Sequence, residues 1–321
     1  MFMKQILLTR KLHKFAMNQL QKKYELTIHT GIIPMPKKLL LQKIKNADGL
    51  ICFPYDIIDR EIIESAKNLA VISTYSVGYD HIDVSAAKKR NIRIGYTPNV
   101  LTNATADLTI GLMLDLMRRI TEGDRLVRAG SWGEIFGPHD YTGIDLEGKT
   151  LGILGIGRIG QAVAKRAQVF GLNIIYHSRT RLTKNQESKL GTRFASFSDL
   201  IRSSDILTIH IPYKKETHHL IDLQILKKMK KSSFLINTSR GKIINEKDLI
   251  QALKAKTISG AALDVFEKEP IGKNHELTKM ENVVLAPHIG SSSAETRHKM
   301  AQITIQNLIL GLQGRKMVYS V

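Results

Sequence analysis

The amino-acid sequence predicts an α/β protein with two lobes, each built on a parallel sheet. Short apolar segments typical of strands alternate with helical segments along the whole chain, and they fall into two series. The second series opens on a glycine-rich turn between a strand and a helix. A length of 321 residues suits two such lobes better than one.

The first strand series occupies the first hundred residues. Its members are five short apolar segments, at residues 5–9, 25–29, 49–53, 70–74 and 92–96. Residues 99–120 follow and predict one long helix, because Leu108, Leu112, Leu116 and Ile120 recur at helical spacing. Residues 123–149 are rich in glycine and polar side chains, hold the only tryptophan, Trp132, and predict irregular structure.

The second strand series begins at Leu151. Its six predicted strands are residues 151–155, 173–177, 206–212, 233–238, 259–265 and 282–288. A terminal helix is expected over 291–312. Because the first series is short, we expect this helix to return and complete the first lobe.

The composition limits the classes of partner and compartment. The chain has 48 basic and 29 acidic residues, a net charge of +19 that favours anionic ligands. This excess is spread along the chain without a basic tail, so a nucleic-acid partner is not expected. A single cysteine, Cys52, excludes an internal disulfide framework and a cysteine-rich metal site. No apolar stretch reaches membrane-spanning length, so we expect a cytoplasmic protein with no membrane partner. We also expect no bound metal.

The glycine-rich turn lies at Gly155–Gly160 and fits the pattern G-x-G-x-x-G through Gly155, Gly157 and Gly160. A predicted strand precedes it, and the helix that follows ends at Gly171 before the next strand begins. Glycines at this position let backbone N–H groups approach a pyrophosphate at the helix N-terminus. The context predicts a Rossmann-like lobe that binds a dinucleotide.

The residues after the second strand of that lobe bear on which dinucleotide binds. A site specific for NAD usually has an acidic residue there, but this sequence has Ser178, with Arg179 and Arg181 beside it. Serine and arginine suit the extra phosphate of NADP, which a carboxylate would repel. NADP(H) is therefore the predicted cofactor and NAD(H) the alternative, and a solvated basic loop is the other interpretation of these arginines.

Four reactive side chains follow the ends of later strands, and in a parallel sheet those ends share one edge. They are Arg240, Asp264, Glu269 and His288. A histidine held and kept protonated by a carboxylate can donate a proton to a carbonyl that receives a hydride. An arginine can bind a substrate carboxylate and polarise that carbonyl. Each residue alone is more typical of a surface ion pair, but their convergence predicts carbonyl reduction.

In six motifs the sequence resembles the family of D-isomer-specific 2-hydroxyacid dehydrogenases. Within that family the resemblance is nearest to glyoxylate and hydroxypyruvate reductases. The motifs are SVGYDHID, NVLTNATADLTIGLML, GILGIGRIGQAVAKRA, NTSRGKIINEKDLIQAL, GAALDVFEKEP and NVVLAPHIGSSSAETR. The match extends over essentially the whole chain and is strongest from Ser73 onward, and so many matches in the same order make the resemblance far more specific than a single glycine motif.

The resemblance implies roles for particular residues. Arg240, Glu269 and His288 match the catalytic arginine, glutamate and histidine, and Val77 and Gly78 match a loop whose amides hold the substrate carboxylate. Further positions match contacts to the cofactor, and of these Asp264 would face the nicotinamide amide. These positions are Thr105, Arg158, Ile159, Pro212, Thr217, Thr238, Asp264 and Gly290.

The resemblance also implies an organisation and an activity. Residues 1–98 and 290–321 would form the substrate domain, with the dinucleotide-binding domain, residues 99–289, inserted between them. A homodimer would form along Asn103–Ile120. The enzyme would reduce glyoxylate or hydroxypyruvate with NADPH to the D-2-hydroxy acid. Alternatives are a dehydrogenase of phosphoglycerate, a reductase of a bulkier 2-oxo acid, and a dinucleotide-sensing corepressor. The adjacent His218 and His219 are expected at the solvent-facing start of a helix.

Overall fold

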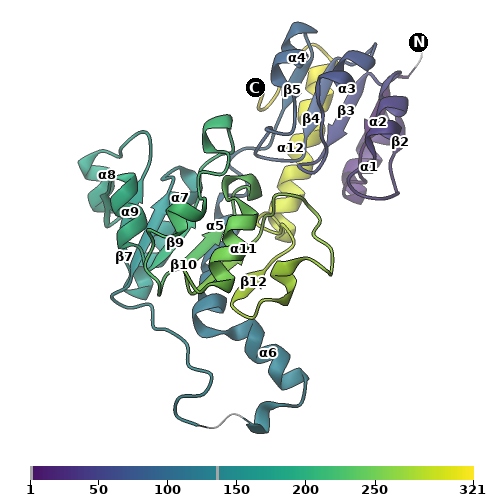
Figure 1. Ribbon diagram of the computed structural model, residues 1–321. Coiled ribbons are helices and arrows are strands. Elements are labelled where there is room, and N and C mark those ends of the chain that lie inside the picture. The colour runs from purple at the N-terminus through teal and green to yellow at the C-terminus, as the bar shows by residue number, and fades with distance from the viewer. Residues whose placement is uncertain (1–2, 135–136) are drawn as a thin grey trace. The chain divides into compact units, whose positions relative to one another are not determined.

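The computed structural model describes residues 3–134 and 137–321, and the chain forms two compact units. Unit 1 comprises Met1–Leu101 and Ser292–Val321, and unit 2 comprises Thr102–Ser291. Each unit is built on one parallel sheet flanked by helices (Figure 1). The predicted fold class is therefore confirmed.

Unit 1 contains a five-stranded parallel sheet in the order β2-β1-β3-β4-β5. All five strands lie within the predicted segments, because each is a short apolar run that the sheet buries. They are β1 (Gln5–Leu8), β2 (Glu25–Ile28), β3 (Gly49–Cys52), β4 (Val71–Thr74) and β5 (Arg93–Gly95). The helices are α1 (Lys14–Gln21), α2 (Lys37–Ile44), α3 (Arg60–Ser65), α4 (Val84–Lys89) and α12 (Ala294–Leu312).

Helix α12 comes from the end of the chain and packs against β3, β4 and β5, as predicted. Two glycines allow this close approach. A Cβ atom on Gly311 would lie 2.7 Å from Val71, and one on Gly49 would lie 2.8 Å from Leu308. The last helix of the chain thus packs on the first sheet and belongs to unit 1.

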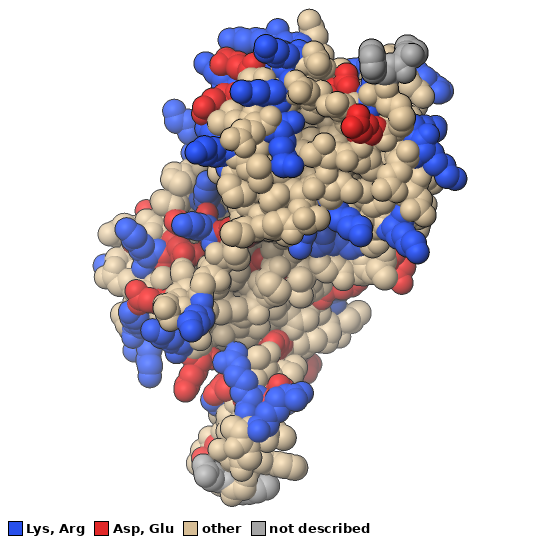
Figure 2. Space-filling view, turned by 90° about the vertical axis from the view of Figure 1, so that its right-hand side faces the viewer, with Lys and Arg blue, Asp and Glu red and all other residues tan. Residues whose placement is uncertain are grey.

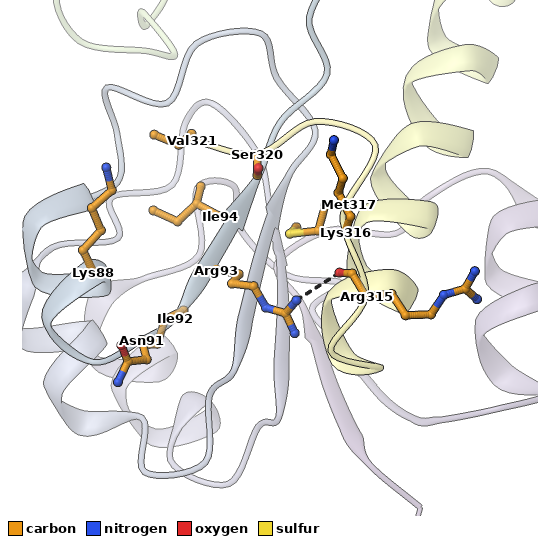
Figure 3. A pocket seen from close by; sticks show the side chains of 10 residues that line it. All are labelled: Lys88, Asn91, Ile92, Arg93, Ile94, Arg315, Lys316, Met317, Ser320 and Val321. Atoms are coloured by element: carbon orange, nitrogen blue, oxygen red, sulfur yellow. Dashed lines mark hydrogen bonds between the residues drawn. The ribbon is translucent and has the colours of Figure 1, made fainter.

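The residues after α12 lie along the edge strand β5 (Figure 3). Ser320 forms an antiparallel bridge with Gly95, and the Arg93 guanidinium donates to the carbonyl of Arg315 at 3.0 Å. A cavity of about 370 Å³ lies beside this contact. The cavity is lined by Lys88, Asn91, Ile92, Arg93, Ile94, Arg315, Lys316, Met317, Ser320 and Val321.

Unit 2 contains a seven-stranded parallel sheet in the order β12-β11-β10-β9-β6-β7-β8. The strands are β6 (Thr150–Leu154), β7 (Asn173–His177), β8 (Thr192–Phe194), β9 (Ile206–Ile209), β10 (Phe234–Asn237), β11 (Gly260–Leu263) and β12 (Val283–Leu285). Six were predicted. Strand β8 was not predicted, because this three-residue edge strand has the exposed Arg193 at its centre and no apolar run.

Helices connect the strands of unit 2, and short 3₁₀ turns occupy several loops. The α-helices are α5 (Thr102–Arg118), α6 (Ile120–Arg128), α7 (Arg158–Ala167), α8 (Lys184–Lys189), α9 (Phe197–Ser203), α10 (Leu223–Leu226) and α11 (Glu246–Lys254). The 3₁₀ turns are η1 (Trp132–Glu134), η2 (Gln168–Phe170), η3 (Lys215–Thr217), η4 (Gly241–Ile243) and η5 (Glu276–Lys279).

The strand order reverses direction between β6 and β9. From β6 the chain proceeds outward through β7 and β8, and from β9 it proceeds the other way through β10, β11 and β12. Ligands of open parallel sheets bind outside the carboxyl ends of the strands at such a reversal. This position therefore locates the candidate site.

The prediction for residues 99–149 was partly wrong. The long helix ends at Arg118, and α6 occupies residues that were predicted to be irregular. Between the two helices Arg119 has a left-handed backbone with φ of 57°, and its side chain pairs with Glu122. The N–H of Thr121 donates to Asp115 at 2.7 Å. These polar contacts within the turn separate the two helices.

Candidate active site

The glycine-rich turn joins β6 to α7 at the reversal of strand order. Gly155 has a φ of +101°, a conformation that side chains disfavour. A Cβ atom on Gly155 would lie 2.7 Å from the backbone of His210 at the end of β9, and one on Gly160 would lie 2.1 Å from the carbonyl oxygen of Gly155. These two glycines permit a tight turn between closely packed backbones.

The start of α7 fits the pyrophosphate of a dinucleotide. A Cβ atom placed on Gly157, the N-cap, would meet nothing within 4 Å, so open space faces the turn. The N-cap supplies no capping side chain, and the first helical turn contains no acidic residue. The N–H groups and dipole of this end favour an anion. Gly155, Gly157, Arg158, Ile159 and Gly160 therefore form a suitable cradle.

The three residues expected at the NADP phosphate differ in their contacts. Arg181 donates to Glu187, with its Nε atom 2.8 Å from Oε1, and also lies over the ring of Phe194. Hydrogen bonding to Arg181 lowers the pKa of the Glu187 carboxyl to about 2. Ser178 is half-buried and Arg179 is exposed. The structure thus pairs Arg181 with Glu187, whereas Arg179 is exposed to solvent.

Two more expected cofactor residues, Pro212 and Thr217, lie in the segment that follows β9. The Thr217 hydroxyl lies 3.1 Å from the carbonyl oxygen of Pro212 and accepts from the N–H of Lys214 at 2.7 Å. His210 directly follows β9 and lies next to Gly155, and it was not among the residues predicted from the sequence. Burial lowers the pKa of His210 to about 3, so its imidazole is neutral and can hydrogen bond to Thr208.

The predicted acid and its carboxylate partner are in direct contact. The Nδ1 atom of His288 lies 2.6 Å from Oε2 of Glu269, and both side chains are mostly buried. The other carboxylate oxygen, Oε1, accepts from the N–H of Phe266 at 2.9 Å. The Glu269 carboxylate is therefore fixed at both oxygens, and it fixes the imidazole in turn.

Asp264 holds the loop that carries His288. Asp264 is 1% exposed, and its carboxylate accepts hydrogen bonds from the N–H of Ile289 at 2.7 Å and from that of Gly290 at 2.8 Å. The Thr105 hydroxyl donates to the carbonyl of Gly290 at 2.9 Å. Burial raises the pKa of Asp264, while the two N–H bonds favour its ionised form. Asp264, expected to face the nicotinamide amide, thus has both oxygens engaged by backbone N–H groups next to His288.

Thr238, another expected cofactor residue, belongs to a buried chain of hydroxyls. Its Oγ1 atom lies 3.0 Å from that of Thr109, and Thr109 donates to the carbonyl of Thr105 at 2.8 Å. Thr109 was not predicted as a site residue, although it falls one helical turn after Thr105. This chain connects the end of β10, through α5, to the loop at Gly290.

Arg240 follows β10, the neighbour of β11, on the same edge of the sheet as Glu269. Its Nη1 atom donates to the carbonyl of Ser239 at 2.9 Å, and its own carbonyl accepts from the side chain of Asn237 at 2.9 Å. Val77 and Gly78 lie in unit 1, in the half-buried segment after β4. Arg240, Glu269, His288 and the glycine turn all belong to unit 2.

Residues 3–134 and 137–321 contain no cluster of three or more His, Cys, Asp or Glu side chains able to hold a metal ion. Within the same residues, no helix combines the length and apolar character needed to cross a bilayer.

A nucleotide cradle and a histidine–carboxylate pair on one edge of a parallel sheet define a nicotinamide-dependent oxidoreductase. Comparison with known proteins is more specific. Residues 110–290 match the NAD-binding domain of the D-isomer specific 2-hydroxyacid dehydrogenases. The chain belongs to this family and is a dehydrogenase that uses a nicotinamide dinucleotide.

Individual relatives agree with this assignment. A glyoxylate reductase of Thermofilum pendens is 47% identical over 281 residues, which cover 88% of this chain and 83% of that protein. A crystal structure of a Thermus thermophilus protein, 42% identical, matches with a TM-score of 0.91 over 99% of each chain. An NADPH-dependent glyoxylate/hydroxypyruvate reductase of Sinorhizobium meliloti, solved with NADP and malonate, is 29% identical. It matches with a TM-score of 0.87 over all of this chain and 97% of its own.

Proposed function

We propose that this enzyme reduces a small 2-oxo acid, glyoxylate or hydroxypyruvate, to the corresponding D-2-hydroxy acid with NADPH. The observation that carries the proposal is the 2.6 Å contact between His288 and Glu269 on the sheet edge that also holds the glycine turn. The similarity to glyoxylate reductases supports the class of substrate.

The bound dinucleotide supplies the hydride, and residues of this chain would supply orientation and a proton. Because Glu269 engages Nδ1 of His288, the opposite ring nitrogen, Nε2, is the atom that would donate a proton to the developing alkoxide. Arg240 would bind the substrate carboxylate and polarise its carbonyl, and the amides of Val77 and Gly78 would hold the same carboxylate.

A substrate panel tests this proposal. We expect glyoxylate and hydroxypyruvate to give the highest kcat/KM with NADPH, well above phenylpyruvate and above the oxidation of 3-phosphoglycerate with NADP⁺. Chiral analysis of the hydroxypyruvate product should give the D-glycerate. A preference for phosphoglycerate oxidation or for the bulkier oxo acid would replace the proposed substrate but not the family.

Cofactor choice gives the first quantitative prediction. A hydrogen bond to a charged group contributes about 1.5–3 kcal/mol, so we expect kcat/KM for NADPH to exceed that for NADH by at least about tenfold. We expect Arg179→Ala to remove much of that ratio by weakening NADPH while sparing NADH. Ser178→Asp should lower the ratio further, since it repels the phosphate and accepts from the ribose hydroxyls.

Arg181→Ala provides the matched control, because the ion pair with Glu187 already occupies this guanidinium. We expect it to change the cofactor ratio less than Arg179→Ala does. Steady-state kinetics with both cofactors measure the ratio of kcat/KM for NADPH to that for NADH in each protein. Equal use of NADH and NADPH by the unmodified enzyme would show that the arginines are only a solvated loop.

Assembly gives a second prediction. Most apolar side chains of α5 are already buried inside unit 2, but α6 buries no residue at all. Three apolar side chains on α6 and η1 are more than half exposed, namely Ile120, Val127 and Trp132. Figure 1 shows α6 extending away from the sheet of unit 2. We propose that a second copy of this chain covers this segment together with the outer face of α5.

Light scattering at micromolar concentration should therefore give the mass of a homodimer. We expect Val127→Asp to raise the dimer dissociation constant at least about tenfold, because it places a charge in an apolar contact. Val169→Asp is the control, since Val169 is 82% exposed in η2 and lies outside the proposed interface. A monomeric mass for the unmodified protein would refute the assembly.

The net charge of +19 does not by itself indicate another partner. Figure 2 shows Lys and Arg side chains scattered over the face in view, with Asp and Glu among them, and no single basic patch. A scattered excess of this kind attracts small anions generally, including 2-oxo acids and dinucleotides.

A further inference from the structure

Two glutamates outside the catalytic set join the segments that carry Arg240 and Glu269. Glu246 begins α11, six residues after Arg240, and Glu267 lies two residues before Glu269. The N–H of Glu246 donates to Oε1 of Glu267 at 3.0 Å, and the N–H of Glu267 donates to Oε2 of Glu246 at 3.2 Å. The carboxylate of each glutamate thus accepts a hydrogen bond from the backbone N–H of the other. We call this reciprocal pair the Glu246–Glu267 clamp.

Two histidines hold the clamp from outside. The Nε2 atom of His219 lies 2.7 Å from Oε1 of Glu267. His275 donates from Nε2 to Oε1 of Glu246 at 3.0 Å, because its Nδ1 atom accepts from the N–H of Leu277. His219 was expected at the start of a helix, but it lies after η3 and donates its own N–H to the carbonyl of Lys242. Both carboxylates are therefore held by backbone and imidazole together.

The two segments also touch directly at Gly241, the residue after Arg240. A Cβ atom there would lie 1.9 Å from the carbonyl carbon of Phe266 and 2.5 Å from the nitrogen of Glu267. No side chain fits between these backbones. The clamp adds hydrogen bonds between the same two segments. Phe266 also donates its N–H to Glu269, which links this contact to the proposed catalytic carboxylate.

We propose that Glu246 and Glu267 are positioning residues that set the spacing between Arg240 and the Glu269–His288 pair. This inference rests on the proposed function, because it assigns the clamp to the geometry of the same reaction. A hydride transfer that needs a bound carboxylate and a proton donor at one carbonyl depends on that spacing. The clamp joins the two loops through backbone N–H groups and through His219 and His275, so we expect it to act on the reaction through the position of these loops.

Kinetics of four variants test the clamp, namely Glu246→Ala, Glu267→Ala, Glu267→Gln and the double variant Glu246→Ala/Glu267→Ala. Glu267→Ala removes the acceptor for the Glu246 N–H, and we expect kcat to fall about tenfold, since misplacement by about an ångström is costly to catalysis. Glu267→Gln keeps an oxygen in the same place, and we expect it to restore kcat to within about threefold of the unmodified enzyme. The double variant Glu246→Ala/Glu267→Ala should be no slower than the slower single variant, because the two residues act as one unit. The affinity for NADPH should stay unchanged in all of them.

Asp205→Ala is the matched structural control. Asp205 accepts the N–H of Thr150 at 2.8 Å and pairs with Lys230, so its loss also removes a carboxylate that joins two segments. It lies at the amino end of β9, on the opposite edge of the sheet. We expect it to lower the melting temperature without changing kcat below that temperature. If Asp205→Ala slows the enzyme as much as Glu267→Ala does, the clamp is merely structural.

A second measurement separates the clamp from the identity of the substrate. The proton between His288 and Glu269 should give a low-field NMR resonance in protein labelled with ¹⁵N-histidine, assigned by its loss in His288→Gln. We expect Glu267→Ala to shift or broaden it and Glu267→Gln to retain it. If the unmodified enzyme reduces no 2-oxo acid, the proposed function fails and this resonance still reports on the clamp. If the enzyme is active but Glu267→Ala leaves both kcat and the resonance unchanged, the clamp proposal is overturned.

Discussion

Replacing His288 with alanine is expected to lower kcat about 100-fold or more, the scale of general acid catalysis. The reason is positional as well as chemical. Glu269 holds one ring nitrogen at 2.6 Å, and the two N–H groups that follow His288 are fixed by the buried Asp264. An imidazole held in this way is already oriented for proton transfer. Steady-state reduction of glyoxylate measures the effect, and a kcat close to that of the unmodified enzyme would rule His288 out as the acid.

Two further variants separate the acid from its supports. Glu269→Gln keeps the shape of the side chain but removes the charge that favours the imidazolium, so we expect a smaller loss in kcat than for His288→Ala. Asp264→Asn offers one acceptor where two N–H groups now bind, and we expect it to lower kcat and the melting temperature together. The binding of NADPH to His288→Ala, measured by fluorescence titration, should remain, which shows that the protein is folded.

The fold could be predicted largely because its signals are local. Each buried strand of a parallel sheet is a short apolar run, and the glycine turn identifies its βαβ unit through the turn itself. The topology of a parallel sheet also predicts that Arg240, Glu269 and His288 follow strand ends on the same edge, without any knowledge of loop structure. The contact between Glu269 and His288 follows that expectation.

The remaining features depend on contacts that no local pattern encodes. Strand β8 is three residues long at an edge, and α6 follows a left-handed residue inside a polar segment. The ion pair between Arg181 and Glu187 could not be predicted, because it depends on how the segment after β7 folds to bring Glu187 beside Arg181. The Glu246–Glu267 clamp joins two segments 21 residues apart, and each glutamate alone resembles an ordinary helix start or loop charge.

Arg240→Lys is expected to lower kcat/KM for glyoxylate by about 10- to 100-fold while NADPH affinity changes little. Lysine retains the positive charge but loses the planar fork that binds a carboxylate through two parallel hydrogen bonds. Arg240 extends from a segment fixed by Asn237, by the close contact of Gly241 with Phe266 and by the clamp beyond it, so the loop cannot readily move to compensate for a shorter reach.

The loss from Arg240→Lys should appear in KM as well as in kcat, because the guanidinium would bind the carboxylate before the reaction and polarise the carbonyl during it. Arg179→Ala is the opposite control, since it is expected to weaken NADPH and leave the KM for glyoxylate unchanged. If Arg240→Lys instead weakens NADPH and leaves substrate kinetics intact, Arg240 belongs to the cofactor site. The proposed binding of the carboxylate would then depend on the amides of Val77 and Gly78, and alanine at Val77 would be expected to show only a small effect, because it keeps the backbone amide.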